Sequence, residues 1–309
     1  LEDSEDLLLR GYANNTEGIG LYTAASYEAG MKSISGAIDA YEKAGDLWEL
    51  NLAHFHRGCC HFGLGNLAEA VAEARWTFAS STRLGDSRML CSSYLWARAT
   101  RGNLPFEELK SCYPSRPDDI MSTVHGIMAE GHWHRFHGRT EESLQMFEEA
   151  GEQIRKSLCV NAHMILALPE LATALRLHAD AVEAKDPRQC ELLRRRAYRL
   201  AKWGARITRF FPAAYPLALR ELSLNLMIRG KFEKALKVAD RSCTVADRQK
   251  AQFEHAQSLL VRGQIAHQRG RPEAAEQIRS ATAALDAMEK AIPGAARGQG
   301  QPAGSIRSS

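Results

Sequence analysis

The sequence predicts an all-α protein built as a solenoid of about seven stacked antiparallel helix hairpins. Apolar residues recur at helical spacing through nearly the whole chain, and no run of alternating β-branched residues indicates a strand. Proline is scarce, at 10 of 309 residues. Glycine-centred breaks interrupt the helical pattern at a nearly regular period. A regular period of helix pairs is typical of repeat proteins, in which each hairpin buries its apolar face against the next.

The turns are predicted at five glycines that each precede a polar residue: Gly65-Asn66, Gly102-Asn103, Gly138-Arg139, Gly230-Lys231 and Gly270-Arg271. Each resembles a helix C-terminus closed by a left-handed glycine and followed at once by a new helix. The glycines are 37, 36, 92 and 40 residues apart, and 92 is twice 46. One hairpin without a turn glycine is therefore expected between Gly138 and Gly230.

The helix pairs follow in order along the chain. The first, over residues 16–45, lacks a turn glycine, and the third has a short second helix that ends before Pro114. The fifth is expected as a helix over 160–184, a break at Asp186-Pro187 and a helix over 188–210. The second, fourth, sixth and seventh pairs surround Gly65, Gly138, Gly230 and Gly270.

Small residues recur seven positions before and five positions after the turn glycines. The sets are Gly58, Gly65 and Ala70; Gly131 and Gly138, with Ser143 in place of alanine; Ser223, Gly230 and Ala235; and Gly263, Gly270 and Ala275. A small side chain allows two antiparallel helices to approach closely. This pattern resembles the tetratricopeptide repeat family over roughly residues 16–290. The resemblance implies a right-handed α-solenoid, a tetratricopeptide-like superhelix with one continuous concave surface.

Units near 40 residues, and the junction phrases AGDLWE and TRLGD, are similar to the helical-repeat regions of large bacterial signalling ATPases. That similarity implies a protein-protein interaction or ligand-sensing scaffold, the regulatory repeat region of a larger bacterial signal-transduction protein. The sequence contains no GxxxxGK[ST] loop. Any ATPase, kinase or cyclase activity is therefore expected in a part of the parent chain outside this sequence.

Composition sets the remaining expectations. The apolar fraction of 45% suffices for a sizeable core, and the net charge of +3 does not by itself indicate nucleic acid. Seven irregularly spaced cysteines indicate free thiols in a reducing compartment, and no apolar run is long enough for a membrane span. A cytoplasmic protein is expected. Residues 1–15 are expected to be a linker or the remains of an upstream helix, residues 16–291 the repeat domain, and residues 292–309 a disordered tail.

Histidines are concentrated in HWHRFHG, residues 132–138, with His125 one heptad upstream. At about 100° per residue, His125 and His132 share a helix face while His134 and His137 point to the opposite side. The latter pair could hold two corners of a zinc site, but a third ligand is missing nearby. The sequence also lacks HExxH and GxSxG. We therefore expect no catalytic residue, metal or cofactor, with a metal- or histidine-dependent enzyme centred on 125–137 as the alternative.

The tetratricopeptide resemblance also implies which residues line the concave groove, because the position after the small residue faces that side. In this register the groove residues are Phe55, Cys59, Phe62, Ser92, Trp96, His125, Met128, His132, Arg135, Arg220, Leu224, Met227, Gln257, Leu260, Gln264 and His267. Such a surface suits a protein or peptide partner with apolar anchors and some negative charge. Other domains of the parent chain are the alternative partner. It also stays open that several of these residues contact neighbouring helices instead.

A basic stripe follows one face of the helix expected over 188–210. It consists of Arg195, Arg199, Lys202, Arg206 and Arg209, opposite an apolar stripe of Leu193, Ala197, Leu200, Gly204 and Ile207. A row of this kind is commonly a solvated helix face. Its functional interpretation is contact with an acidic partner, an acidic neighbouring domain or nucleic acid. Nucleic acid is the least favoured of these because the stripe lacks interleaved aromatic residues.

Overall fold

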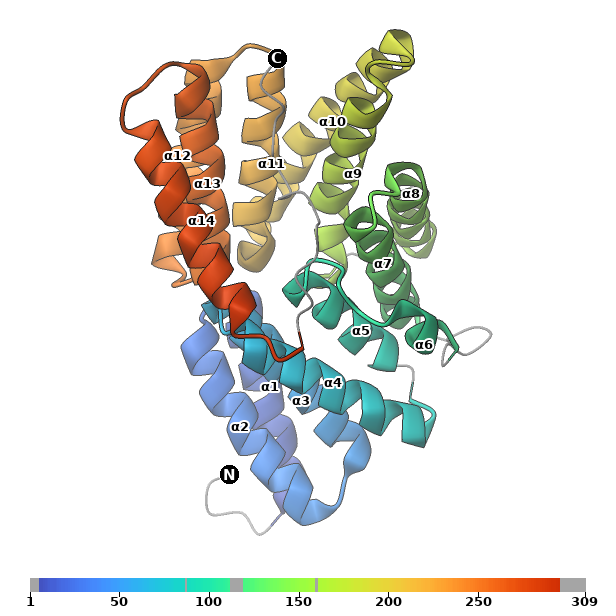
Figure 1. Cartoon of the computed structure of the whole chain (residues 1–309). Coiled ribbons are helices and arrows are strands. Elements are labelled where there is room, and N and C mark those ends of the chain that lie inside the picture. Colours follow the sequence, from blue (N-terminus) through green and yellow to red (C-terminus); the bar gives the residue numbers. More distant parts are fainter. Residues whose placement is uncertain (1–5, 87, 112–118, 159–160, 295–309) are drawn as a thin grey trace.

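The computed structural model describes residues 6–86, 88–111, 119–158 and 161–294. Within these ranges the chain forms helices joined by short turns and contains no strand (Figure 1). The predicted all-α class is therefore confirmed. Consecutive long helices pack against one another along the array, and α5 packs directly against α7.

The first four helix pairs come from the N-terminal half. Their helices are α1 (Leu7–Thr23), α2 (Tyr27–Ala44), α3 (Leu47–Leu64), α4 (Leu67–Leu84), α5 (Arg88–Ala99), α6 (Phe106–Ser111), α7 (Ile120–Phe136) and α8 (Thr140–Ser157). Helix α6 is short, as expected for the third pair. Pro114, which was expected to follow this helix, lies outside the described residues.

The remaining three pairs form the C-terminal half. Their elements are η1 (Met164–Leu166), α9 (Ala167–Val182), α10 (Pro187–Ile207), η2 (Thr208–Phe210), η3 (Pro212–Ala214), α11 (Tyr215–Ile228), α12 (Phe232–Arg248), α13 (Gln252–Gln268) and α14 (Ala274–Lys290). The fifth pair breaks where Asp186 accepts a hydrogen bond from the Gln189 amide at the start of α10. Pro187 occupies the first helical position, where its missing amide proton costs nothing.

The predicted turn glycines all adopt the left-handed backbone conformation. Their φ values are 85° at Gly65, 100° at Gly102, 71° at Gly138, 70° at Gly230 and 66° at Gly270. Two glycines that were not singled out, Gly45 and Gly85, end α2 and α4 in the same way. In the turn between α1 and α2, Ala25 takes a φ of 60°, so the first pair turns without glycine.

Small residues hold the hairpins together at close range. A Cβ atom added to Gly131 would lie 2.8 Å from the Phe147 ring, and one added to Gly58 would lie 2.7 Å from Leu95. The Ser143 hydroxyl donates to the Gly131 carbonyl at 2.9 Å, so serine fits where alanine was expected. The role expected for Ala275 is wrong: Ala275 is exposed and Ala274 is buried.

Helix α14 begins four residues after its turn glycine, whereas α4, α8 and α12 begin two residues after theirs. The later start follows a turn that contains Pro272. The buried small residue is shifted with the start: Ala274 lies four residues after its turn glycine, whereas Ala70 and Ala235 lie five residues after theirs.

Both predicted domain boundaries move outward. Helix α1 begins at Leu7, so residues 7–15 belong to the first hairpin and not to a linker. Gly11 and Asn15 are already buried there, because the α1 residues pack against α2. At the other end, Ile292 is buried in the core of the N-terminal hairpins, although the tail was expected from residue 292. Residues 295–309 lie outside the described residues.

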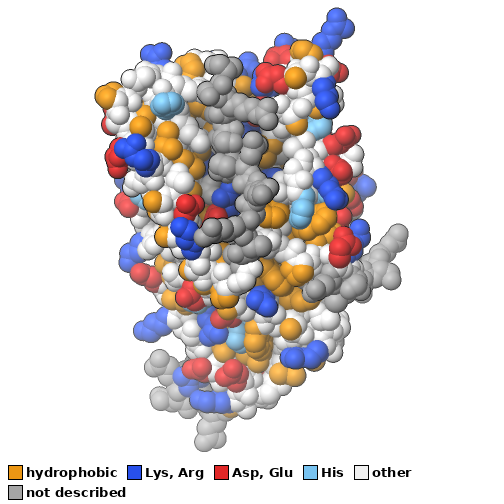
Figure 2. Space-filling model, in the orientation of Figure 1, with side chains coloured by type: hydrophobic (Ala, Val, Ile, Leu, Met, Phe, Trp, Pro, Cys, Tyr) orange, Lys and Arg blue, Asp and Glu red, His pale blue; other side chains and the backbone are white. Residues whose placement is uncertain are grey.

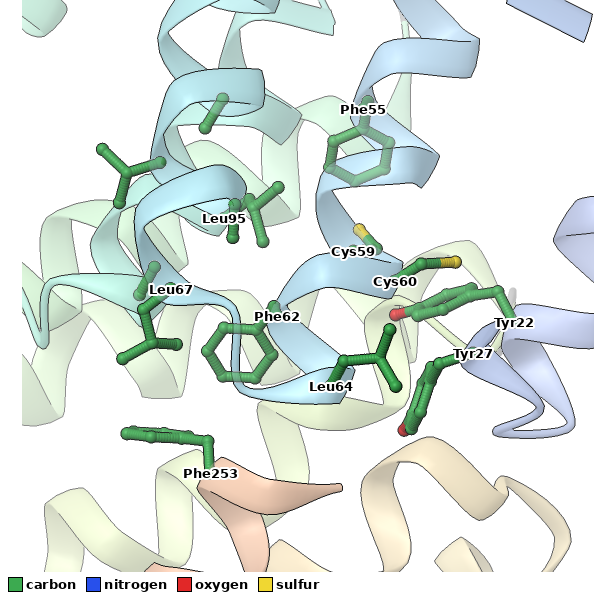
Figure 3. Close-up of a cluster of buried hydrophobic side chains, with 14 of the residues drawn as sticks. Tyr22, Tyr27, Phe55, Cys59, Cys60, Phe62, Leu64, Leu67, Leu95 and Phe253 are labelled. Atoms are coloured by element: carbon green, nitrogen blue, oxygen red, sulfur yellow. The ribbon is translucent and has the colours of Figure 1, made fainter. Parts of the chain in front are cut away.

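The array closes on itself, because the last hairpin packs against the second one. Helix α13 contacts α3 and α14 contacts α4 (Figure 1). We call this the closure contact. Figure 3 shows Phe253 of α13 approaching Phe62 and Leu67, with 5.3 Å between the centroids of the two phenylalanine rings. Two ion pairs reinforce the contact between the ends, Lys250 with Glu28 at 2.6 Å and Arg101 with Glu289 at 2.7 Å.

Candidate functional site

The predicted groove residues all lie on the first helices of their pairs. We call the first helices of the pairs (α1, α3, α5, α7, α9, α11 and α13) the inner helices. Most of the predicted groove residues are covered by other parts of the protein. Phe55, Cys59, Phe62, Ser92, His125, Met128, His132, Arg220, Leu224, Met227 and Leu260 are buried; Trp96, Arg135, Gln257 and Gln264 are partly buried; and His267 is exposed. The alternative in which groove residues contact neighbouring helices therefore applies to much of the set. An open concave groove at these positions was expected, and the closure contact together with the packing of adjacent helices covers it. Their role in partner binding stays a prediction.

The four histidines of α7 and its C-terminal end lie in different surroundings. His125 stacks on Tyr94 with 4.8 Å between ring centroids, and His132 lies 5.8 Å from the same ring. His134 faces Glu130 at 3.6 Å, and the His137 ring contacts the Trp133 carbonyl at 2.8 Å through Nδ1. Among the described residues, no three His, Cys, Asp or Glu side chains are grouped as a metal site requires.

Burial keeps three histidines neutral at pH 7, and we call them the inner histidines: His125, His132 and His163. It lowers the pKa of His125 and of His132 to about 3, and that of His163 to about 4. For His125 the neighbouring His163 acts in the same direction, and for His132 the Glu170 carboxylate opposes the effect of burial without cancelling it. These rings therefore act at neutral pH as uncharged aromatic and hydrogen-bonding groups.

Buried and partly buried arginine–glutamate pairs connect the inner helices one after another. Arg135 of α7 donates to Glu170 of α9 at 2.9 Å. Arg176 of α9 donates twice to Glu221 of α11, at 2.8 and 3.1 Å. Asn225 and Thr173 also donate to the Glu221 carboxylate. Each carboxylate is thus held by side chains of a neighbouring inner helix.

Glu254, in the first turn of α13, completes a ring of such pairs. Its carboxylate accepts from Arg220 of α11 at 2.5 Å and from Arg98 of α5 at 3.2 Å. The Arg98 guanidinium also lies over the Phe62 ring, 4.2 Å from its centroid. Because α5 packs against α7, the connections run from α7 through α9, α11 and α13 back to α5. We call this set of residues the inner ring: Arg98, Arg135, Glu170, Arg176, Arg220, Glu221 and Glu254.

The Glu170 carboxylate is strongly stabilised in its charged form. Burial by itself raises its pKa and is the largest single influence, but Arg135, His132 and Arg98 together outweigh it. The pKa of Glu170 falls to about 2 as a result. The Glu170 carboxylate is therefore charged at every pH at which His125, His132 and His163 are neutral.

Several polar atoms next to the inner ring make no hydrogen bond within the described residues. They are the Tyr94 hydroxyl, the Nε and Nη2 atoms of Arg135, and both ring nitrogens of His125. A backbone group of His163 lies close to the His125 ring. Buried polar groups are normally hydrogen-bonded, so such a concentration points to groups that water or a ligand would satisfy. The donors come from α5 and α7.

Sequence reasoning missed most of the charged residues of the inner ring. Arg98, Glu170, Arg176, Glu221 and Glu254 were not singled out. The available signal was a charge on the apolar face of its helix, since a fully solvated charge would occupy the outer face. Their partners could not be assigned, because the pairs join residues from 34 to 156 positions apart.

Four residues of the basic stripe lie on the exposed face of α10, whereas Arg209 lies beyond the end of that helix, in η2. All five residues of the stripe are exposed, and Arg195 pairs with Glu191 at 2.6 Å. Lys202 and Arg206 line a groove of about 550 Å³ together with residues of α11 and α12. On the face shown in Figure 2, by contrast, basic and acidic side chains are intermixed.

The described cysteines are buried free thiols. Burial raises the pKa of Cys60 and of Cys91 to about 12, and that of Cys243 to about 11. Since the thiolate is the nucleophile, these cysteines are inert at neutral pH. Cys112 and Cys159 lie outside the described residues.

Comparison of the sequence with protein-family models and with curated proteins gave no match. In the described part of the chain, no helix combines the length and the apolar character needed to cross a lipid bilayer.

Proposed function

We propose that this chain is a non-catalytic scaffold that binds a protein or peptide partner, or senses a ligand, at its inner ring. The observation that carries this proposal is the set of unpaired donors beside the ring, because an incoming acceptor would satisfy groups that the fold leaves unsatisfied. Arg135 offers two such nitrogens and Tyr94 one hydroxyl. A carboxylate on the partner fits these donors, since guanidinium groups bind carboxylates in a forked geometry.

The inner histidines do not favour an enzyme. A general base works best when its pKa lies near the working pH, so that it is unprotonated and still basic. Burial instead depresses the pKa of His125 and of His132 to about 3. Both rings pack against Tyr94, as core aromatic side chains do.

Binding at the inner ring would change the balance between closed and open arrays. A partner carboxylate that engages Arg98 or Arg220 competes with Glu254, which holds α13 against α5 and α11. If Glu254 no longer pairs with these arginines, α13 is held less firmly, and the closure contact between α13 and α3 is weakened. A ligand that binds the open array more tightly than the closed array therefore shifts the equilibrium toward the open one.

The resemblance of the sequence to tetratricopeptide repeats and to the repeat regions of bacterial signalling ATPases implies a fold and a cellular role for the scaffold that we propose. It implies that the hairpins wind as a right-handed, tetratricopeptide-like superhelix. It also implies a cytoplasmic regulatory region of a larger bacterial signalling protein, whose effector domain would respond to opening of the array.

The test is quantitative affinity capture from the native cell extract with the intact chain and two matched variants. Arg135→Lys keeps the charge but loses the forked guanidinium, and Arg279→Lys makes the same change on the exposed face of α14. We expect a discrete partner whose capture falls about tenfold with Arg135→Lys and is unchanged with Arg279→Lys, a difference of about 1.4 kcal/mol. Equal capture by all three proteins would place binding away from the inner ring.

A further inference from the structure

The groove between α10, α11 and α12 has an apolar floor and a cationic rim. Its floor is formed by Ala205, Tyr215, Leu219, Leu222 and Val238. The rim is formed by two cations of α10, Lys202 and Arg206, and two cations of α12, Lys237 and Arg241. All four rim residues are exposed, and we call this site the basic groove.

The rim cations are unpaired, in contrast to those on the preceding turns of the same helix. Arg194, Arg195 and Arg196 of α10 each form an ion pair, with Glu183, Glu191 and Glu148 respectively. None of the four rim cations has a carboxylate partner among the residues that the structure describes. The nearby Asp240 carboxylate pairs with Arg262 instead, at 2.6 Å.

The charge arrangement works against helix stability. Lys202 and Arg206 are four residues apart, as are Lys237 and Arg241, so each helix carries a like-charge pair on one face. Like charges at this spacing are destabilising, and here two such pairs border the same groove. Among the described residues, packing within the fold involves only Arg241 of these four cations, because its guanidinium lies over the Tyr215 ring. A negatively charged occupant accounts for all four.

We propose that the basic groove docks an acidic amphipathic peptide helix of a partner protein. Charge complementarity selects carboxylates for the rim, and the apolar floor selects Leu-like side chains between them. The two cations on each helix are spaced by about 6 Å along its axis, which is close to one helical turn. Acidic residues three or four positions apart on a peptide helix match that spacing. A groove of about 550 Å³ has room for one or two apolar anchors.

The floor favours a peptide over nucleic acid. A nucleic-acid groove combines a basic track with aromatic platforms on which bases stack. The basic groove has a single aromatic lining residue, Tyr215, and Arg241 lies over its ring at 5.3 Å from the centroid. Leu219, Leu222 and Val238 offer no hydrogen bond to a base or a phosphate.

The experiment measures binding of synthetic labelled peptides to the intact full chain by fluorescence anisotropy. The first peptide is an Ala-rich helix with Leu anchors flanked by Glu at helical spacing. In the second peptide Gln replaces Glu, and in the third Ser replaces Leu. A labelled single-stranded oligonucleotide and free inorganic phosphate serve as competing anions. We expect the acidic Leu peptide to bind at least tenfold more tightly than the other two peptides, and more weakly as salt is added.

Matched variants locate the site. The double variant Lys202→Gln, Lys237→Gln removes two rim charges, and Arg195→Gln, Arg196→Gln removes two charges from the same helix outside the groove. We expect at least a tenfold loss of peptide affinity for the first and less than a twofold change for the second. Val238→Thr, a change at a partly buried residue of the floor, is expected to weaken binding of the Leu peptide and to leave binding of the Ser peptide unchanged. Circular dichroism and thermal melts verify that each variant is folded.

Three results of the peptide measurements would each overturn the proposal. These are absence of binding by the acidic Leu peptide, equal binding by the Leu and Ser peptides, or equal affinity in the two double variants. Tighter binding of the oligonucleotide than of the peptide would make the groove a polyanion site and would also overturn it. None of these results bears on the inner ring, whose residues are different.

Discussion

Glu254 is the residue on which the inner ring closes. It lies in the first turn of α13, where the helix dipole favours a negative charge, and it accepts from two arginines of other helix pairs. The Glu254 side chain is 6% exposed. Water can therefore replace its carboxylate beside Arg98 or Arg220 only if the surrounding core opens. Buried ion pairs add little net stability over an apolar core, but removing one partner leaves a buried charge uncompensated.

We expect Glu254→Gln to lower the free energy of unfolding by about 3–5 kcal/mol, because Arg220 loses its ion-pair partner and Arg98 keeps only the more distant Glu170 carboxylate. The control is Glu276→Gln, which removes an exposed carboxylate paired with Arg279 and is expected to change stability by less than about 1 kcal/mol. Urea unfolding of both variants gives the comparison. Equal stabilities would mean that Arg98 and Arg220 are neutralised by another group.

The buried histidines make stability depend on pH. Their pKa is depressed to about 3 for His125 and His132 and about 4 for His163, whereas an unfolded histidine titrates near 6.5. The unfolded chain therefore binds more protons below about pH 6.5, and the free energy of unfolding falls as pH drops from there toward 4, by about 1.4 kcal/mol per pH unit for each histidine. Glu170, with a pKa of about 2, adds a second loss between about pH 4.5 and 2.

His125→Phe is expected to remove one of these protons and make the slope of stability against pH shallower between about pH 6.5 and 4. Phenylalanine fits the stack against Tyr94 and has no ring nitrogen to leave unsatisfied. Tyr94→Phe changes a neighbouring ring without changing titration in this range, so its slope should match the unmodified protein. Urea unfolding at several pH values measures the slopes, and identical slopes for all three proteins would contradict the assignment.

At the scale of single helices, glycine has two opposite roles in this chain. At Gly58 and Gly131 the missing side chain allows helices to touch, because a Cβ atom would fall within 3 Å of Leu95 or Phe147. At Gly20, near the end of α1, nothing lies within 4 Å of an added Cβ atom. Close packing therefore requires glycine at Gly58 and Gly131. At Gly20 packing does not require it, and glycine only lowers stability there by adding conformational entropy to the unfolded chain.

Gly58→Ala should destabilise the protein by about 1–3 kcal/mol through overpacking against α4 and α5. Gly20→Ala, the same change at an exposed helical site, should stabilise it by about 0.5–1 kcal/mol. Thermal melts monitored by circular dichroism give both values. If the two variants moved the melting temperature in the same direction, close approach at Gly58 would not be limiting.

At the scale of the molecule, the closure contact ties together helices that an open solenoid would keep apart. Phe253 packs on Phe62, and the start of α13 approaches Gly65 closely: a Cβ atom on Gly65 would lie 2.9 Å from the Gln252 Cβ and 3.2 Å from the Phe253 backbone nitrogen. Helix α14 also covers α4. In an open repeat array each unit depends only on its neighbours, whereas here the two ends share one core.

Phe253→Ala should lower the free energy of unfolding by about 3–5 kcal/mol and release the closure contact. Amide hydrogen exchange would then rise in α14 and α4, where the contact is lost, and stay low in α9 and α10. Phe210→Ala is the control, because Phe210 is a large but exposed phenylalanine. Exchange that rises uniformly along the chain would indicate global destabilisation without opening of the array.

Separately expressed halves, cut at Gly138, are not expected to retain the stability of the intact chain. The cut separates Arg98 and Phe62 from Glu254 and Phe253, and it also divides α7 from α8. Denaturant unfolding of each half alone and of the mixed halves measures this. Halves that fold independently with full stability would show that the continuous stack and its closure contribute nothing.

The sequence by itself determined the helical class, the order of the helix pairs and the positions of the turns. These features depend on neighbouring residues: apolar spacing along one helix, a glycine that can take a positive φ, and a proline at the start of α10. The later start of α14 and the early start of α1 escaped prediction because small shifts in a turn change which residues face the core. Gly45 and Gly85 end their helices by the same local mechanism and could have been found.

Only the tertiary structure decided which charges meet and whether the array is open. Arg98 and Glu254 lie 156 positions apart and Lys250 and Glu28 lie 222 apart, and no local pattern links them. The curvature that brings α13 to α3 is the sum of small rotations at every helix interface, so it is set by side-chain packing along the whole array. That curvature buries most of the predicted groove residues and leaves Lys202 and Arg206 exposed beside the cations of α12.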